Sequence, residues 1–408
     1  MIVDPLAALT RLHRRRGDVA RIPVPGVRAY LVSDPDAIQD ALTRTQREYA
    51  KGVGWRGREP LRRVLGQGLL TSPPELHREQ RRLVQPLFHG ERVAAYAETF
   101  TALADAAFAA WRPGEVREVH RDLSELTLAI VARTIFDVAV DADAITTISR
   151  AIGRNQRALR REVLPGGRLL DALPLPATRR WRADSRAVDA VIHALIADRR
   201  AHPGGADLLS LLLATGMPAR QVRDEAITLL IAGHETTANA LAWTFHLLAT
   251  HPAAQDRIAD DDGEYTMAVV REALRLYPPA WAIWRRLVAD REVGGRRLPA
   301  GSTLILSPWV VHRDPRWWPE PAAFQPERWL PPASAPRRYT YFPFGAGPRQ
   351  CVGNGFAELE AARVTAAVCR RWRLAPAPGA PPVAPQPLIT LRPRHGVFLA
   401  VTPRRPLP

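Results

Sequence analysis

The longest stretch of helical pattern lies near the middle of the chain, between Pro218 and Pro252. Apolar residues recur through it three and four positions apart, which is the spacing of one face of an α-helix. At the rise of an α-helix, a segment of this length would extend about 50 Å and could cross a whole domain. The pattern therefore predicts one long, mostly buried helix at the centre of the fold.

Shorter patterns of both kinds surround this helix. Two strands are predicted at residues 20–23 and 29–32, joined through a Pro25-Gly26 turn. Ser33-Asp34-Pro35 then caps a helix that runs to about Thr45. Further helices are predicted at Glu75–Phe88, Glu91–Trp111, Asp122–Asp137, Glu264–Tyr277 and Ala357–Val368, and further strands at Thr303–Ser307 and near the C-terminus. The chain is therefore predicted to be mainly α with a small β-rich subdomain.

Two segments lack a sustained period. Lys51–Pro74 has the pattern of a long loop with one short helix, and long loops inside compact domains are usually functional. Ala142–His202 contains helical patterns that prolines and glycines interrupt. Within it, four arginines recur at helical spacing: Arg154, Arg157, Arg160 and Arg161. They form either a solvated helix face or a face that receives an anionic substrate or a carrier protein.

Composition is that of an ordinary globular protein, with 46% hydrophobic and 24% charged residues among 408. Length alone does not decide between one large domain and several small ones. Met1–Ala20 holds no apolar run long enough for a signal peptide or a membrane anchor, so we expect a cytoplasmic protein.

The charge balance indicates which kinds of partner to expect. Lys and Arg total 57 against 41 Asp and Glu, a net charge of +16 that is almost all arginine. The arginines are scattered over every segment, without a helix-turn-helix, zinc-finger or aromatic platform pattern, so nucleic acid is not expected as a partner. A basic surface suits the docking of an acidic electron-transfer protein instead.

The first candidate for chemistry is the stretch from Phe344 to Gly353, which frames Cys351 with glycines, an arginine and an aromatic ring. Glycines let backbone N–H groups approach a sulfur and temper its charge. Arg349 can pair with a carboxylate of a cofactor, and Phe344 can shield the sulfur from water. A helix predicted just beyond would favour a thiolate at its N-terminus. We therefore interpret Cys351 as an iron ligand and Cys369, the other cysteine, as buried packing.

The second candidate lies in the middle of the long helix, at Ala232-Gly233-His234-Glu235-Thr236-Thr237. Glycine and threonines are poor helix formers, so helix stability does not explain them. Ala232 and Gly233 leave room beside the helix, while Glu235 and Thr236 place an acid next to an alcohol. A threonine hydroxyl that bonds to a carbonyl one turn earlier can open the helix locally. By helical geometry, the His234 side chain is expected to point away from this site, so it is not proposed as an iron ligand.

Both stretches match signatures of one family. The first fills every fixed position of F-x-x-G-x-R-x-C-x-G, and the second fills [AG]-G-x-[DE]-T-[TS]. In these motifs, and over about residues 15 to 402, the chain resembles the cytochrome P-450 family. The resemblance implies a single haem domain over residues 1–408, with haem b between the long central helix and the Cys351 loop.

The resemblance also assigns further residues. It implies that His77 and Arg81, in an H-x-x-x-R pattern on one helix face, bind the haem propionates together with Arg285, although Arg286 leaves that last choice open. Glu272, Arg275 and Arg328 correspond to a buried structural Glu-Arg-Arg network. Other cofactor contacts are implied for Ala232, Gly233, Phe344, Arg349 and Gly353. The implied substrate pocket is lined by Leu69, Leu70, Ile231, Ala232, Ala280, Trp281, Ala282, Ile389 and Thr390.

For function, the resemblance implies a monooxygenase that inserts one oxygen atom from O2 into an apolar molecule. Glu235 and Thr236 would deliver protons. Electrons would come from NAD(P)H through a ferredoxin and its reductase, docked near Arg78, Arg82, Arg349 and Arg370. The apolar pocket favours a terpenoid in natural-product biosynthesis; a fatty acid or polyketide is the alternative. A peroxide-driven peroxygenase or a haem sensor would leave the acid and alcohol pair unexplained.

Overall fold

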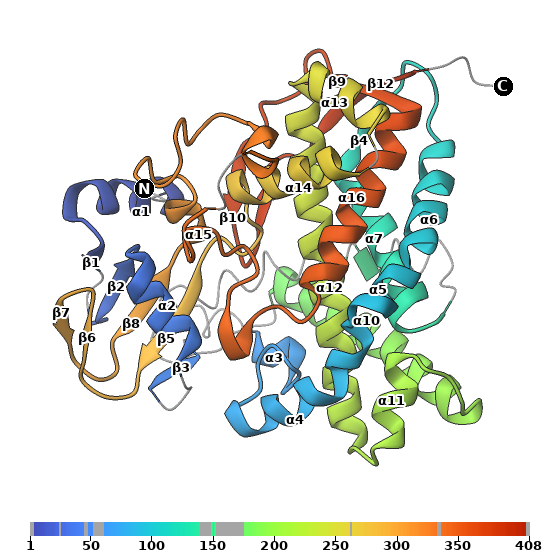
Figure 1. Cartoon of the computed structure of the whole chain (residues 1–408). Helices are drawn as coiled ribbons and strands as arrows, with labels where there is room; N and C mark the ends of the chain where they lie inside the picture. Colours follow the sequence, from blue (N-terminus) through green and yellow to red (C-terminus); the bar gives the residue numbers. More distant parts are fainter. Residues whose placement is uncertain are drawn as a thin grey trace. The chain divides into compact units, whose positions relative to one another are not determined.

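The computed structural model of the chain describes residues 4–23, 26–44, 48–51, 61–138, 148–149, 151, 175–261, 263–332 and 336–404 (Figure 1). The predicted turn residue Pro25 and the arginines Arg154, Arg157, Arg160 and Arg161 lie outside these ranges, as do residues 52–60 of the predicted loop.

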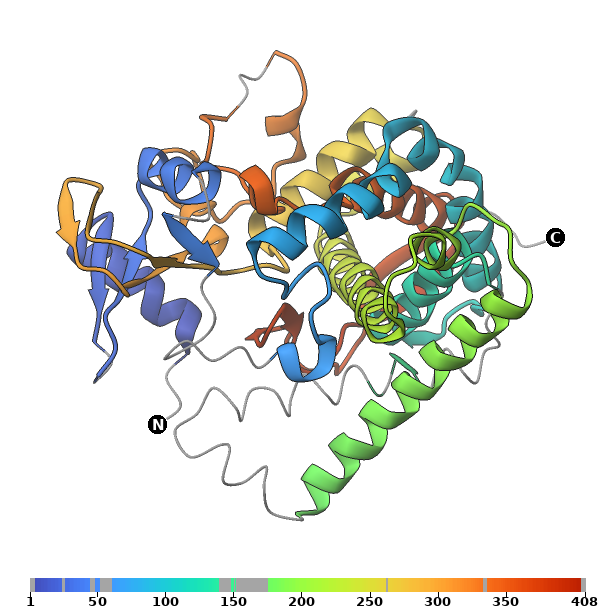
Figure 2. The ribbon, with the colours of Figure 1, turned by 90° about the horizontal axis from the view of Figure 1, so that it is seen from below.

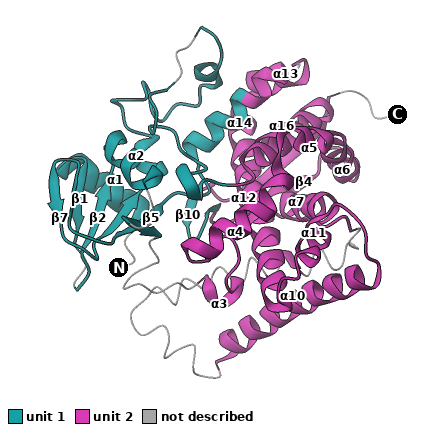
Figure 3. Ribbon diagram, turned by 60° about the horizontal axis from the view of Figure 1, so that its bottom comes forward, with its two compact units in different colours: residues 1–58, 268–351, 385–392 teal, residues 59–267, 352–384, 393–408 magenta. Residues whose placement is uncertain are grey.

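The chain forms two compact units, each built from separate stretches of sequence (Figure 3). Unit 1 comprises residues 1–58, 268–351 and 385–392, and unit 2 comprises 59–267, 352–384 and 393–408. Neither unit is a continuous piece of chain. The expectation of a single haem domain over residues 1–408 stays a prediction.

Unit 1 is organised around a five-stranded sheet in the order β1-β2-β8-β5-β3. The strands are β1 Val19–Ile22, β2 Ala29–Val32, β3 Tyr49–Lys51, β5 Ile283–Leu287 and β8 Thr303–Leu306. β1 and β2 pair in antiparallel register, with Val19 opposite Val32, which confirms the two strands predicted from the sequence. β2 and β8 run parallel, whereas β5 is antiparallel to both β8 and β3.

Two helices of unit 1 show why its first segment folds as it does. In α2, Pro35–Thr43, the predicted cap is confirmed, since the Asp34 carboxylate accepts a hydrogen bond from the Ala37 N–H at 2.8 Å. α1, Pro5–Arg16, is capped in the same way by Asp4 but is absent from the predictions. Many of its residues are polar, so its pattern is weak. The other elements of unit 1 are β6 Arg291–Val293, β7 Arg296–Leu298, α15 Pro308–Val311, η3 Pro326–Trp329, η4 Gly347–Arg349 and β10 Pro385–Pro387.

Unit 2 is built around α12, Ala219–Ala249, which confirms the long central helix (Figure 2). Helices α7, α10, α11, α13 and α16 all pack against it. Its helices are α3 Arg62–Leu65, α4 Pro74–Val84, η2 Gln85–Phe88, α5 Gly90–Ala95, α6 Ala97–Ala109, α7 Val119–Ile135, α10 Pro176–Ala201, α11 Leu208–Ala214, α13 Pro252–Ala259 and α16 Asn354–Arg371. A three-stranded sheet joins β4 Val116–Glu118, β12 Phe398–Pro403 and β9 Trp372–Pro376. α14, Glu264–Leu276, and β11, Leu391–Pro393, contribute residues to both units.

Element boundaries differ from the sequence predictions in physically understandable ways. The predicted helix Glu91–Trp111 is split at Tyr96 into α5 and α6. α7 begins at Val119 rather than Asp122, because the Glu118 carboxylate caps its first N–H groups. A further helix not predicted from the sequence, α13, starts with Pro252 as its first residue.

Among the residues that the structure describes, no helix combines the length and apolarity needed to span a membrane.

Candidate functional site

In unit 1, the loop before Cys351 makes a sharp turn that only glycine accommodates. Gly345 and Gly347 both have φ of 68°, in the left-handed region. A Cβ on Gly347 would also lie 2.2 Å from the Leu42 carbonyl oxygen. The turn is closed by a hydrogen bond from the Cys351 N–H to the Phe344 carbonyl at 2.9 Å. These constraints present Cys351 as an exposed thiol.

The helix predicted beyond the cysteine is α16, which begins three residues later, at Asn354. Gly353 has φ of −98°, outside the left-handed region. What restricts it is space, since a Cβ there would lie 3.3 Å from the Phe88 ring. Cys369 is fully buried, as predicted, and burial raises the pKa of its thiol to about 12. The chain therefore has one accessible and one inert cysteine.

Two arginines of unit 1 influence each other's charge. Arg285, on β5, is buried and donates to the carbonyls of Ala41 and Trp284. Burial, with a further contribution from the positive charge of Arg349, lowers the pKa of Arg285 to about 10. Within the described part of the chain, no carboxylate pairs with Arg285. This environment fits an anionic group such as a haem propionate. Of the two arginines that the sequence left open, Arg286 is the exposed one.

The pocket residues predicted in unit 1 come from two segments that the structure brings together. The Trp281 ring N–H donates to the Leu388 carbonyl at 3.0 Å, and the Leu391 N–H donates to the Pro279 carbonyl at 2.9 Å. Ala280 and Ala282 lie in the turn before β5, while Ile389 is exposed and Thr390 is buried in the other segment. These hydrogen bonds join two stretches that are separated by about a hundred residues of sequence.

The predicted Glu-Arg-Arg network exists and is larger than expected. Arg275 donates to both oxygens of Glu272 at 2.8 Å, and Arg328 reaches Glu272 at 3.2 Å. The Trp329 ring N–H and the Gln325 backbone N–H also donate to this carboxylate, at 3.0 Å each. Glu272 and Arg275 are both fully buried. The network is therefore a satisfied structural support.

In unit 2, the middle of α12 carries the predicted back-bonding threonines. Ile231, Ala232, Gly233 and Thr236 are only partly buried, although most of their neighbours along the helix are buried. The Thr236 hydroxyl donates to the Ala232 carbonyl at 2.5 Å, and the Thr237 hydroxyl donates to the Gly233 carbonyl at 3.0 Å. Both bonds confirm the expected back-bonding. The strip is less covered at Ala232 and Thr236, while a Cβ on Gly233 would lie 3.0 Å from a Val131 methyl group, so this glycine lets α7 pack closely.

Glu235, next to Thr236, has a partner that the sequence did not indicate. The Asn239 side-chain amide donates to Glu235 Oε1 at 3.1 Å, and Asn239 Oδ1 lies 2.8 Å from Nε2 of His120 on α7. His234 is buried on the α7 side, where its carbonyl accepts a hydrogen bond from Thr127. Burial, with the nearby His120, lowers the pKa of His234 to about 3, so this ring is neutral.

A clamp holds the loop that carries Leu69 and Leu70 against α12. Asp224 accepts from the Gln67 N–H at 2.8 Å, and Glu225 accepts from the Leu69 N–H at 3.0 Å. A Cβ on Gly68 would lie 2.1 Å from the Thr228 hydroxyl, so the backbone approaches as closely as glycine allows. Leu69 is buried in this arrangement, while Leu70 is 42% exposed. Burial raises the pKa of Glu225 to about 7.

The predicted propionate pair on α4 has the expected spacing of one helical turn. His77 is buried and Arg81 is partly buried, whereas Arg78 and Arg82 on the same helix are exposed. The helix therefore turns His77 and Arg81 inward and keeps its other arginines in solvent.

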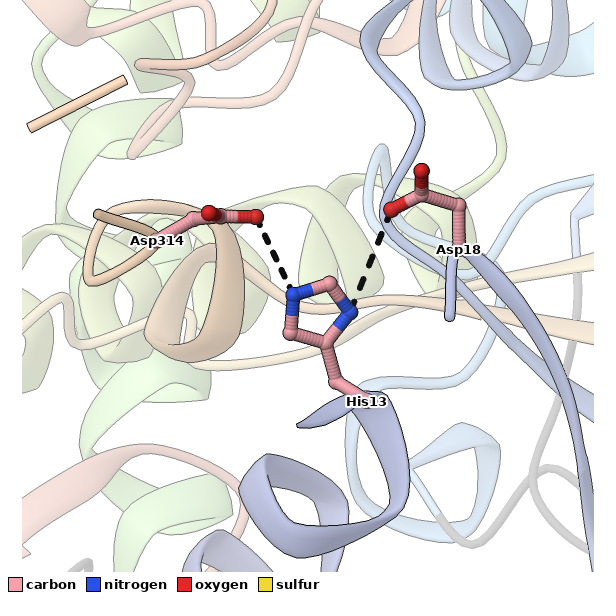
Figure 4. Close-up of side chains that lie close together, drawn as sticks. All are labelled: His13, Asp18 and Asp314. Atoms are coloured by element: carbon pink, nitrogen blue, oxygen red, sulfur yellow. Dashed lines mark hydrogen bonds and ion pairs between the residues drawn. The ribbon is translucent and has the colours of Figure 1, made fainter. Parts of the chain in front are cut away.

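A separate cluster of potential metal ligands in unit 1 is already satisfied. His13 lies between Asp18 and Asp314, with Nε2 3.0 Å from the Asp314 carboxylate (Figure 4). Arg316 pairs with both carboxylates at 2.6 Å, and the Ser33 hydroxyl lies 2.8 Å from His13 Nδ1. Because a cation already neutralises the carboxylates, we interpret the cluster as a tie that fixes α1.

Comparison with known proteins agrees with the motifs. The chain matches the family described as Cytochrome P-450 over residues 4–400. It is 35% identical to cyclooctatin synthase from Streptomyces melanosporofaciens, over 100% of this chain and 92% of that protein. It is 33% identical to pentalenene oxygenase from Streptomyces avermitilis, over 100% and 94%.

A solved structure gives the same result. The crystal structure of a six-coordinated cytochrome P-450 from Thermus thermophilus has a TM-score of 0.81 with this chain, at 33% identity, and the match covers 98% of this chain and 99% of that one. Sequence and fold therefore agree along nearly the whole length. The chain belongs to the cytochrome P-450 family and is a monooxygenase.

Proposed function

We propose that this monooxygenase binds haem b through Cys351 and oxidises an apolar terpenoid by hydroxylation or epoxidation. The observation that carries the proposal is the exposed thiol of Cys351, held on a glycine turn three residues before α16. Family membership implies haem as the cofactor. When bound, the haem supplies the activation of O2 that puts one oxygen atom into the substrate.

The residues present fit this group. Arg285 and Arg349 in unit 1, and His77 and Arg81 in unit 2, supply cationic and hydrogen-bonding side chains for two propionates. Ala232 offers a small side chain on a partly buried strip of α12, Gly233 lets α7 pack closely against the same helix, and Phe344 and Gly353 flank the cysteine. We propose that these residues belong to a single haem domain over residues 1–408.

Glu235 and Thr236 are proposed to move protons. The Thr236 hydroxyl donates to the Ala232 carbonyl, and rotation of that bond would free it to hold a water or substrate-derived oxygen. The Glu235 carboxylate is held by Asn239, so its position is fixed before any proton moves. An acid and an alcohol on adjacent residues can pass a proton from solvent-side water to the reacting face.

The proposed substrate is apolar because the candidate lining is apolar. Leu69, Ile231, Ala280 and Trp281 offer carbon surface, and Leu70 and Ile389 add exposed side chains. The names of the relatives favour a terpenoid, since cyclooctatin and pentalenene are terpenoids. A fatty acid or a polyketide, free or carried by a protein, is the alternative class.

Electrons are proposed to come from NAD(P)H through a ferredoxin and its reductase. Arg78 and Arg82 on α4, and Arg370 on α16, are exposed basic residues of unit 2 that suit an acidic partner. Reduction by the ferredoxin should then slow as salt concentration rises. Rates that do not change with salt would contradict this mode of docking.

The deciding experiment is the absorption spectrum of the dithionite-reduced protein with and without carbon monoxide. A strongly red-shifted Soret band should appear in the wild type and in Cys369→Ala, and should be lost in Cys351→Ala. Cys369 is the matched control because it is the other cysteine and is buried. No haem in the wild type, or the same band in Cys351→Ala, would refute the assignment.

A second comparison separates the monooxygenase from a peroxygenase. Turnover of a terpene hydrocarbon with NAD(P)H, ferredoxin, reductase and O2 should exceed turnover with hydrogen peroxide alone. Thr236→Val should lower the first rate more than the second, because peroxide already carries the protons. Equal loss of both rates would count against the proposed role of Thr236.

A further inference from the structure

Helix α7 supplies a buried side chain to the acid of α12. His120 lies in the first turn of α7, and its Nε2 is 2.8 Å from Asn239 Oδ1. The same amide reaches Glu235 Oε1 at 3.1 Å through its nitrogen. His120 and Glu235 are each 8% exposed and Asn239 is fully buried. The three side chains form a buried line from α7 to the acid, across 119 positions of sequence between His120 and Asn239.

The first turn of α7 is itself fixed, so His120 has a defined position. The Glu118 carboxylate accepts hydrogen bonds from the backbone N–H groups of His120 and Val397, at 3.2 and 3.0 Å. The Ser124 hydroxyl donates to the His120 carbonyl at 2.7 Å. A Cβ on Gly396 would lie 2.6 Å from Glu118, which shows how closely the residues just before β12 approach this cap. The backbone of His120 is therefore fixed by α7 and by the segment that leads into β12.

The chemistry of the amide fixes the direction of every hydrogen bond in the line. Because the Asn239 nitrogen donates to the Glu235 carboxylate, the Asn239 oxygen faces His120. An amide oxygen can only accept, so Nε2 of His120 must carry the proton that it donates. An ionised Glu235 therefore requires one amide orientation and one protonated nitrogen of the ring.

We infer that Asn239 and His120 are positioning residues for Glu235, and that the Asn239 amide couples the Glu235 carboxyl group to the His120 ring. The inference rests on the proposed proton-moving role of Glu235. When Glu235 takes up a proton, its O–H needs an acceptor, and the amide meets this by turning its oxygen toward Glu235. The amide nitrogen then faces His120, whose Nε2 must accept while the ring proton lies on Nδ1.

The Asn239 amide therefore has two orientations, each with its own set of hydrogen bonds. In one state Glu235 is held ionised by a donor; in the other it is held protonated by an acceptor. Each change adds or removes one proton at Glu235 and moves the ring proton of His120 from one ring nitrogen to the other. The line thus gives Glu235 a satisfied partner both before and after it delivers a proton.

The test changes Glu235 and observes the ring of His120, which lies at the other end of the line. In protein labelled with nitrogen-isotope histidine, NMR identifies the protonated ring nitrogen of each of the 11 histidines, and the signals of His120 are those missing in His120→Gln. The carbon monoxide complex of the reduced protein is diamagnetic and is the form to measure. We expect the wild-type proton on Nε2.

Glu235→Gln keeps the shape of the side chain but offers both a donor and an acceptor. Both amide orientations then become possible, so the His120 proton should be shared between Nε2 and Nδ1, with at least about a tenfold rise in the Nδ1 form. Asn239→Leu should remove this response, so that adding Glu235→Gln to it changes nothing further at His120. A merely structural role of Asn239 and His120 does not produce such a response.

The matched control is Thr127→Val. It deletes another buried hydrogen bond between α7 and α12, from the Thr127 hydroxyl to the His234 carbonyl at 3.0 Å, without touching the line. The His120 signals should stay as in the wild type. Thermal melting of each variant shows that the fold is kept, and Glu235→Leu serves as a second variant if Glu235→Gln does not fold.

The outcomes separate this inference from the proposed function. A wild-type proton on Nδ1, or no change at His120 in Glu235→Gln, overturns the inference even if the Cys351 spectrum is as expected. If the wild type binds no haem, the proposed function fails, and the same NMR comparison on the haem-free protein still decides whether the coupling exists.

Discussion

Two buried arginines of unit 1, Arg275 and Arg285, differ in how their charge is compensated. Arg275 is fully buried and donates to both oxygens of Glu272 and to the carbonyls of His312, Pro321 and Ala323. Arg285 is 7% exposed and, among the described residues, donates to two carbonyls, with the like charge of Arg349 nearby. Within this described part, the charge of Arg275 is paired with a carboxylate and the charge of Arg285 is not.

The difference shows which arginine supports the fold and which serves a ligand. A guanidinium does not lose its proton in proteins, so a pKa of Arg285 lowered to about 10 describes a charge that is poorly solvated rather than a neutral side chain. A buried charge without a counter-ion is costly, and an anionic ligand that pairs with it removes that cost. Arg275 has no such need.

The largest effect should come from breaking the complete network. Glu272→Ala would leave Arg275 buried without its counter-ion, which costs about 3–5 kcal/mol of the free energy of unfolding. Urea denaturation of the variant measures this loss. Glu327→Ala is the control, because Glu327 is an exposed acid of the η3 turn and should change stability by less than about 0.5 kcal/mol. Equal effects of the two changes would contradict the role of the network.

Glu225 of unit 2 extends the comparison from buried arginines to a buried acid, which has no cationic partner among the described residues. Glu225 accepts only from an N–H and from amide side chains in the described part of the chain, and burial raises its pKa from 4.5 to about 7. Because the folded-state pKa is raised, this carboxyl stabilises the fold below its ordinary pKa. The contribution is lost as pH rises to about 7.

The size of this pH effect follows from the two pKa values. A change from 4.5 to about 7 corresponds to about 3 kcal/mol of unfolding free energy. Urea denaturation of the wild type and of Glu225→Gln, across that pH range, should therefore show a difference that changes by about this amount. Glu75→Gln, at an exposed acid of α4, is the matched control. A constant difference between wild type and Glu225→Gln would refute the raised pKa.

The smallest expected effect concerns Arg285. Arg285→Met should weaken haem binding about tenfold, equivalent to about 1.4 kcal/mol, because one charged hydrogen-bond donor to a propionate is lost. The haem-free variant should be at least as stable as the haem-free wild type. Haem transfer to apomyoglobin measures retention. Arg286→Met is the matched control at the exposed neighbour. Weakened retention in Arg286→Met alone would reverse the choice between the two arginines.

The elements and local pairs were predictable because their signals are local. The period of α12, the Asp34 cap of α2 and the spacing of Glu272 and Arg275 each depend on residues a few positions apart. The glycines around Cys351 were also interpretable, except that Gly353 is restricted by the Phe88 ring rather than by its φ.

The contacts that were missed join residues far apart in sequence. Asp224 and Glu225 hold the backbone of Gln67 and Leu69, which are more than 150 positions away. His120 meets Asn239 across 119 positions. Neither pair has a motif, and an acid on a helix ordinarily predicts a solvated position. The packing of α7 against α12 brings His120 to Asn239, and the packing of α3 and its following loop against α12 brings Gln67 and Leu69 to the two acids.

The contrast between the two cysteines allows a measurement on any preparation of this protein. The Cys351 thiol is exposed in the chain by itself, whereas Cys369 is buried and burial raises the pKa of its thiol. A maleimide should therefore label one cysteine per folded chain without cofactor, and none in a chain whose sulfur is bound to iron. Mass spectrometry of the labelled sample would then count the cofactor-free molecules directly, without relying on their colour.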